Sequence, residues 1–185
     1  MTSGGARRSH TTIGQDIKNR KDIALTPAQI ADLPRIIDIY NHYVMHALTP
    51  FATEPYSVES RVPWFETFDE GRYRLLVAAG AEGILGWTSS SRDRPTEPFD
   101  WTVETSIYLH PECRTKGVGS RLYQGLLALL QEQPIHLALA GIALPNDASV
   151  ALHRKFGFEE VGTFREYARK RGTWISSTWF QKPMK

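Results

Sequence analysis

Hydrophobic residues recur along this chain with two different periods, and each period predicts a different kind of element. Alternating apolar and polar residues, or a short apolar run between turn residues, are typical of β-strands. One run, residues 135–144, is almost wholly apolar, as in a strand buried on both faces. The pattern predicts strands at residues 23–27, 74–79, 83–90, 101–109, 135–144, 160–167 and 174–181, the last two forming a closing hairpin.

Apolar residues spaced three and four apart predict four helices between these strands. The first opens at Asp32-Leu33-Pro34, because proline is tolerated in a first turn. The others are expected over residues 58–70, around the leucines at 122, 126 and 130, and over residues 146–157. The order β-α-α-β-β-β-α-β-α-β-β predicts an α/β fold, a mixed sheet with helices on both faces, as one domain over residues 22–185.

Composition and charge narrow the class of protein. Of 185 residues, 41% are hydrophobic and 23% are charged, as in an ordinary globular domain. No apolar run reaches about 18 residues, so we expect no membrane span. Residues 1–21 hold five basic side chains and one acidic one, whereas the whole chain is only +2. We expect a disordered tail there, although a basic tail can also bind nucleic acid. The slightly acidic remainder argues against a nucleic-acid partner.

A basic glycine turn, Arg-Thr-Lys-Gly-Val-Gly-Ser at residues 114–120, joins a predicted strand to a predicted helix. Glycines allow close approach to a ligand, and the first N–H groups of a helix have no intrahelical partner. With the positive end of the helix dipole, they suit a phosphate or pyrophosphate. The spacing matches neither the P-loop nor the dinucleotide fingerprint. Alone, such a turn is equally consistent with a simple tight turn.

This turn resembles the Arg/Gln-x-x-Gly-x-Gly/Ala loop of the GCN5-related N-acetyltransferase (GNAT) superfamily, which holds the pyrophosphate of acetyl-CoA. Other segments follow in the order typical of its phosphinothricin and methionine sulfoximine acetyltransferase branch, over roughly residues 23 to 183. They are Asn41-His42-Tyr43, Thr53-Glu54-Pro55, Asp100-Trp101-Thr102-Val103-Glu104, Leu144 to His153, and Phe156-Gly157-Phe158.

The resemblance implies the GNAT fold, in which the fourth and fifth strands splay apart and admit the pantetheine arm. It also implies a homodimer and acetyl-CoA as the cosubstrate, without a metal. The acetyl-CoA contacts that the resemblance implies are Ile107, Tyr108, Leu109, Arg114, Thr115, Lys116, Gly117, Val118, Gly119, Ser120, Asn146 and Ser149. Lys116, taken alone, could be an ordinary solvated lysine.

Glu104 is the sharpest candidate for catalysis. It lies in an otherwise apolar and aromatic predicted strand, where burial raises the pKa of a carboxyl group and suits it to act as a general base. A salt-bridged structural glutamate fits the same position. The match to the family's Trp-Thr-Val-Glu segment favours the base, which removes the proton of the substrate amine directly or through water.

His153 is the second catalytic candidate. Alone, a helical histidine is typical of packing or capping, but the Asn-Asp-x-Ser-x-x-x-His segment matches the family at Asn146, Asp147, Ser149 and His153. The resemblance implies a supporting acid–base or orienting role. Cys113 invites a nucleophile interpretation, but the sequence shows no supporting His–Asp constellation, and one cysteine without an internal partner fits the cytoplasm. The six histidines show no metal-ligand spacing.

The acceptor side matches the family less well. The resemblance implies an amine on a small amino-acid-like acid, bound by Phe51, Arg92, Arg94 and Phe99, with the equivalent arginine ambiguous because the loop is longer. Ala52 stands where relatives carry a larger residue, and Trp174-Ile175-Ser176-Ser177 replaces a Trp-His-Asp-Val-like pattern. Two alternatives stay open: another acceptor, such as an aminoglycoside or a protein N-terminus, and a non-catalytic acyl-CoA-binding domain.

Overall fold

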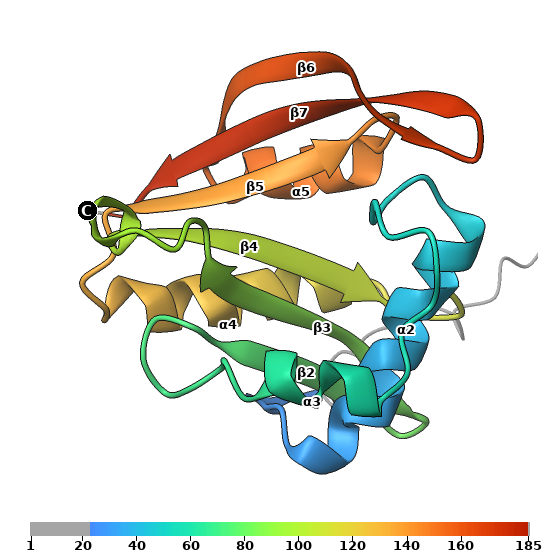
Figure 1. Ribbon diagram of the computed structural model, residues 1–185. Helices are drawn as coiled ribbons and strands as arrows, with labels where there is room; N and C mark the ends of the chain where they lie inside the picture. The colour runs from blue at the N-terminus through green and yellow to red at the C-terminus, as the bar shows by residue number, and fades with distance from the viewer. Residues whose placement is uncertain (1–22, 185) are drawn as a thin grey trace, which may run out of the picture.

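A computed structural model describes residues 23–184, which fold around one seven-stranded sheet in the order β1-β2-β3-β4-β5-β7-β6 (Figure 1). The predicted tail at residues 1–21 lies outside the described residues. The strands are β1 (Ala24–Pro27), β2 (Leu75–Gly80), β3 (Gly83–Arg92), β4 (Thr102–Leu109), β5 (Leu137–Ala143), β6 (Glu159–Lys170) and β7 (Thr173–Pro183). Among the strands of residues 23–184, β4 and β5 alone pair in parallel, so the predicted mixed α/β sheet is confirmed.

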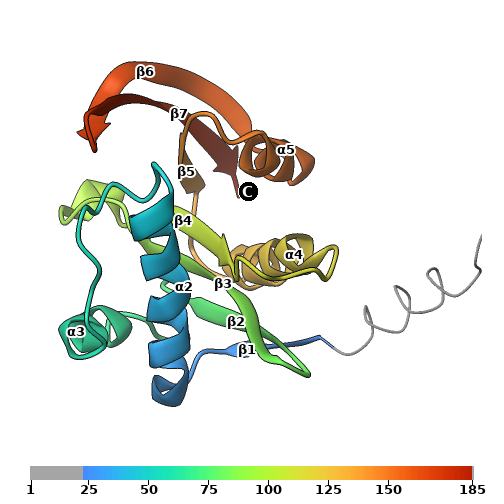
Figure 2. The ribbon, with the colours of Figure 1, turned by 90° about the vertical axis from the view of Figure 1, so that its right-hand side faces the viewer.

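Helices cover both faces of the sheet, as predicted. They are α2 (Leu33–His46), α3 (Val62–Phe65), α4 (Val118–Gln131) and α5 (Asp147–Lys155), with short 3-10 turns at Ile30–Asp32, Glu59–Arg61 and Glu97–Phe99. Figure 2 shows α2 and α3 on one face and α4 and α5 on the other. One core packs the apolar stripe of α2 against Trp87. A second packs the leucines of α4 against β4 and β5, and a third joins Ile23 and Ala78 to Val118 and Leu122.

The predicted helix over residues 58–70 is wrong in length. Only the 3-10 turn and the four residues of α3 form, with Pro63 in the first turn. Beyond them, the carboxylate of Asp69 accepts the N–H of Gly71 at 2.7 Å, and the Asp69 N–H donates to the Tyr73 carbonyl. This local turn ends the helix because an aspartate side chain competes for backbone hydrogen bonds.

The strands β4 and β5 separate after a short paired stretch. Their register runs only from Thr102↔Leu137 to Glu104↔Leu139, whereas β3 stays paired with β4 as far as Leu109. On its other edge β5 pairs with β7 along its whole length. The sheet therefore opens between β4 and β5 beyond Glu104, as the fold implied by the resemblance requires.

Candidate active site

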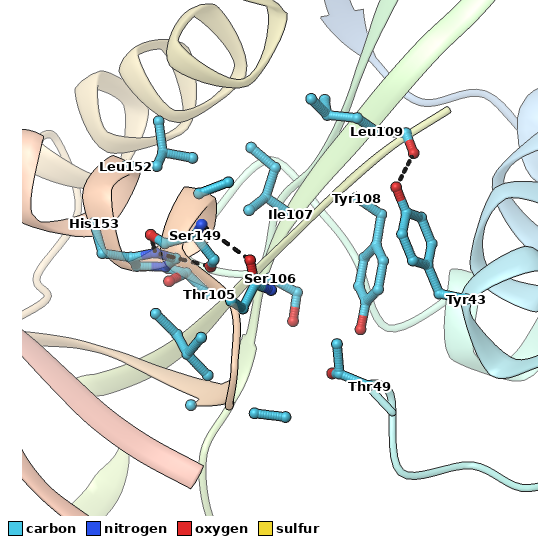
Figure 3. Close-up of a pocket in the computed structure, with 15 residues that line it drawn as sticks. Tyr43, Thr49, Thr105, Ser106, Ile107, Tyr108, Leu109, Ser149, Leu152 and His153 are labelled. Atoms are coloured by element: carbon cyan, nitrogen blue, oxygen red, sulfur yellow. Dashed lines mark hydrogen bonds between the residues drawn. The ribbon is translucent and has the colours of Figure 1, made fainter. Parts of the chain in front are cut away.

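A cavity of about 260 Å³ occupies the opening between β4 and β5 (Figure 3). Because the strands have separated, side chains from both faces of β4 reach it: Thr105 and Ile107 from the α4 side, Ser106 and Tyr108 from the α2 side. The remaining wall residues come from α2, the loop after it, β5 and α5: Tyr43, Thr49, Gly141, Ile142, Ala143, Asn146, Ala148, Ser149, Leu152 and His153, with Leu109 at the end of β4.

The glycine turn forms the N-terminus of α4, as predicted. Gly117 is the N-cap with φ +87°, a left-handed conformation that favours glycine, and makes no side-chain cap. A Cβ added there would meet no atom within 4 Å, so the backbone is open to a ligand. Arg114 and Lys116 are exposed, whereas Val118 and Gly119 are buried, Gly119 against Ile107 and Leu109.

Two residues near this turn add detail that the sequence did not reveal. The Lys155 ammonium, at the end of α5, donates to Ser120 Oγ at 2.9 Å, so a further cation lies beside the first turn of α4. Cys113 is half-buried, and its Sγ contacts the Thr115 carbonyl at 3.8 Å. Arg114 and Thr115 also line a second cavity, of about 460 Å³, together with Glu82.

Glu104 lies at the last paired position before β4 and β5 separate. It shares the α2 face of β4 with Ser106 and Tyr108, by strand alternation. Burial raises the pKa of its carboxyl group, and the nearby negative charge of Asp93 raises it further. Within residues 23–184 the ion pairs do not include Glu104. The raised pKa expected from its strand context is confirmed, and Asp93 is a neighbour that sequence reasoning missed.

His153 lies on the opposite face of β4, in a buried polar chain. Its Nε2 is 2.6 Å from the Tyr123 hydroxyl. That hydroxyl is 2.7 Å from Thr105 Oγ1, and Thr105 Oγ1 in turn lies 3.0 Å from the Leu139 carbonyl. Its Nδ1 is 2.7 Å from the Ser149 carbonyl. Because that carbonyl only accepts, Nδ1 carries a proton, and in the neutral ring Nε2 accepts the Tyr123 proton. Burial lowers the pKa of His153, which favours this neutral ring.

Asn146 caps α5, since its Oδ1 accepts the N–H of Ser149 at 3.1 Å. Asn146, Ser149 and His153 all line the cavity, so the matched segment is brought together at its α5 wall. Tyr43, which sequence reasoning quoted but did not assign, donates its hydroxyl to the Leu109 carbonyl at 2.7 Å. Tyr108 and Thr49 both line the cavity and lie close to each other (Figure 3).

The four residues expected to bind the acceptor do not line the cavity. Arg92 forms an exposed ion pair with Asp100 at 2.7 Å, and the Arg94 guanidinium stacks 5.0 Å from the Phe99 ring. Phe51 is 42% exposed, with its ring against Tyr167. Arg92 nevertheless pairs with Val103, one residue from Glu104. The four side chains therefore lie outside the cavity wall.

Comparison with known proteins decides the family. The family model described as an acetyltransferase (GNAT) domain matches residues 25–179. The chain belongs to the GNAT acetyltransferase family. A phosphinothricin N-acetyltransferase of Streptomyces coelicolor is 42% identical over 166 residues, covering 88% of this chain and 97% of that protein. An L-methionine sulfoximine/L-methionine sulfone acetyltransferase of Pseudomonas aeruginosa is 37% identical, covering 85% and 92%.

Solved structures of the GNAT family agree with the fold described above. A GNAT phosphinothricin acetyltransferase from Sinorhizobium meliloti, solved in complex with acetyl-CoA, superposes with a TM-score of 0.82 at 31% identity, covering 88% of each chain. The present GNAT chain is thus an acetyltransferase whose relatives acetylate amines. Residues 23–184 contain no helix that could span a membrane, and no group of three or more His, Cys, Asp or Glu side chains arranged to hold a metal ion.

Proposed function

We propose that this enzyme transfers the acetyl group of acetyl-CoA directly to the amino group of a small amino-acid-like acceptor, similar to phosphinothricin or methionine sulfoximine. The observation that carries the proposal is the cavity between β4 and β5, with Glu104 at the point where the strands separate. Ile107 to Leu109, which follow Glu104 in β4, line the cavity, and the exposed glycine turn comes after them in the chain. Glu104 itself is not a wall residue, and burial raises the pKa of its carboxyl group.

The cofactor side suits acetyl-CoA along its length. The free amides at the start of α4, with Arg114 and Lys116, would hold the pyrophosphate, and the open side of Gly117 leaves room for it. The cavity walls at Ile107 to Leu109, with Asn146 and Ser149, would hold the pantetheine arm. Binding energy gained at the distant phosphates positions the thioester at the reacting end.

Glu104 would accept the proton of the acceptor ammonium, so that the free amine attacks the thioester carbonyl. The new C–N bond replaces the C–S bond, and coenzyme A leaves as a thiolate that takes up a proton. A general base must be partly unprotonated at the working pH while remaining basic, which a raised carboxyl pKa provides. His153, on the other face, would orient the cavity wall or supply a proton through Tyr123.

The acceptor class is supported by the basic side chains near Glu104. Arg92 and Arg94 follow the stretch of β3 that pairs with Glu104, and both are exposed. Their guanidinium groups suit the carboxylate or phosphinate oxygens of an amino-acid analogue. An aminoglycoside would instead call for several acidic groups around the amine.

A thiol-release assay tests the proposal. The protein is incubated with acetyl-CoA and, separately, phosphinothricin, methionine sulfoximine, an aminoglycoside and a peptide with a free N-terminus. We expect release with the two amino-acid analogues. Release with only the aminoglycoside or the peptide would move the acceptor to another class. Tight acetyl-CoA binding without release by any amine would support a non-catalytic acyl-CoA-binding domain.

We also propose that the protein is a cytoplasmic homodimer. The strand β6 forms one edge of the sheet and exposes apolar side chains along it: Val161 at 60%, Phe164 at 57% and Tyr167 at 51%. A long exposed edge strand with apolar side chains pairs readily with another chain. Light scattering should give twice the chain mass of 20.9 kDa. A monomer mass at every concentration would rule the dimer out.

A further inference from the structure

The tip of the β6–β7 hairpin lies beside the end of α2 and the loop after it (Figure 1). Arg171 and Gly172, at φ +51° and +80°, form the two-residue turn between the paired residues Lys170 and Thr173. Further back, the register jumps from Phe164↔Ser177 to Ala168↔Ile175, which inserts extra residues into β6. Such a bulge bends a strand, and here the tip lies against the end of α2 and the loop after it.

Two cations at this tip bind backbone carbonyls far away in the chain. The Lys170 ammonium donates to the Pro50 carbonyl at 2.7 Å, although the residue is only 2% exposed. The Arg171 guanidinium donates to the Val44 carbonyl at 2.9 Å. That carbonyl belongs to the last turn of α2, where carbonyls have no intrahelical partner and the helix dipole favours a cation.

The segment held in this way borders the cavity. Thr49, directly before Pro50, lines the cavity wall beside Tyr108 (Figure 3). Phe51, directly after it, places its ring 5.9 Å from that of Tyr167 on the same hairpin. The Pro50 carbonyl therefore lies between a wall residue and an aromatic ring outside the cavity wall.

We propose that Lys170 is a positioning residue for the acceptor: by binding the Pro50 carbonyl, it fixes Thr49 and Phe51 at the entrance through which the amine arrives. A buried ammonium is costly without a partner, so its placement needs this carbonyl. The residue does not contact the cavity, and its effect passes through the loop. The expected effect on acceptor kinetics rests on the proposed function, whereas the anchoring of the loop by Lys170 does not.

The kinetic test compares Lys170→Met with Arg169→Met. Methionine keeps an unbranched apolar stem but cannot donate a hydrogen bond. Arg169 lies at the same tip, where it stacks on Trp174 and donates to the Gly172 carbonyl within the hairpin. We expect Lys170→Met to raise the KM for the acceptor about tenfold, equivalent to about 1.4 kcal/mol. Its kcat and its Kd for acetyl-CoA should stay within about twofold, because the cofactor side is untouched. Arg169→Met should leave all three constants unchanged.

A structural readout separates this proposal from the proposed function. In Lys170→Met, amide hydrogen exchange should quicken at residues 47–56 and stay unchanged in β4 and α4. Faster amide exchange at residues 47–56 in the variant, with no turnover by the wild-type protein, would refute only the proposed reaction. Unchanged exchange and unchanged acceptor KM, in a folded variant of an active enzyme, would overturn the role of Lys170. An equal loss of acetyl-CoA affinity would overturn it too, since the effect would then be general.

A second variant covers the case in which Lys170→Met does not fold. Arg171→Asn removes only the bond to the Val44 carbonyl, and asparagine tolerates the left-handed conformation of that position. The same loop should exchange faster, and the acceptor KM should rise, by a smaller factor. No change in either measurement would refute the anchoring of this loop by the hairpin tip.

Discussion

The two sides of the cavity are built from different kinds of contact. On the cofactor side, the strand β4, the glycine turn, α4 and α5 follow one another within residues 102–155. The Asn146–Ser149 and Ser149–His153 bonds span three and four positions. On the acceptor side, Lys170 and Arg171 reach carbonyls 120 and 127 positions away. Short-range contacts leave motifs in a sequence, whereas long-range contacts leave isolated residues without a pattern.

The two sides also differ in electrostatics. The mouth of the cofactor side carries exposed cations, Arg114 and Lys116, at the positive end of a helix. The acceptor side holds two carboxyl groups, Glu104 and Asp93, close enough for one to raise the pKa of the other. We therefore expect the exposed cations to attract a polyanion and the two carboxyl groups to attract an ammonium group.

The largest expected effect is a loss of acetyl-CoA binding on the cofactor side. We expect Gly117→Glu to abolish acetyl-CoA binding, because the new carboxylate would occupy the open side of the N-cap and repel the pyrophosphate. Gly117→Ala is the matched control: it adds only the strain of a left-handed conformation, about 1–2 kcal/mol. Calorimetry with acetyl-CoA checks both. Unchanged affinity in a folded Gly117→Glu protein would exclude the turn as the pyrophosphate site.

The next largest expected effect is a loss of turnover caused by a change on the acceptor side alone. Glu104→Gln should lower turnover by roughly 10²–10⁴-fold and leave acetyl-CoA binding intact, because the amide cannot accept the ammonium proton. The wild-type rate should rise as pH passes the raised pKa of Glu104, above the ordinary 4.5, and this limb should vanish in the variant. Asp93→Asn should keep activity and move the limb to lower pH, since it removes a charge that raises that pKa.

A stability measurement tests the alternative that Glu104 is a structural residue. Its folded-state pKa lies above the unfolded value, so its ionised form destabilises the fold at pH values above both. Glu104→Gln should therefore melt no lower than wild type at pH 8. A clear fall in Tm with near-normal turnover of the folded protein would identify Glu104 as a structural partner instead of a base.

What the sequence could predict follows the same division. The strands, most of the helices and their order along the chain were predictable because hydrophobic period is a local signal. The helix over residues 58–70 was not, since the turn at Asp69 outcompetes it. Arg92 and Arg94, which were expected to bind the acceptor, do not line the cavity. Tyr123 and Lys170 carried no signal, because one reads as an ordinary core aromatic and the other as a basic turn residue.

The smallest expected effect is a lower melting temperature after a change in the buried polar chain on the cofactor side. Tyr123→Phe removes the hydroxyl between His153 and Thr105, leaving a buried Nε2 unpaired, at a cost of about 1–3 kcal/mol. For a chain of this size the Tm should fall about 2–4 °C per kcal/mol. Tyr56→Phe, at an exposed ring, is the control and should melt like wild type.

The pH dependence of this Tm difference shows which form of His153 the hydroxyl serves. The folded-state pKa of His153 is lowered, so wild type should lose stability as pH falls below the unfolded value of about 6.5, until the folded ring also protonates. If Tyr123 donates to the neutral ring, the deficit of Tyr123→Phe is already complete at pH 8. A deficit that appears only below pH 6.5 would mean that the hydroxyl accepts from an imidazolium, and the proton order along Thr105, Tyr123 and His153 would be reversed.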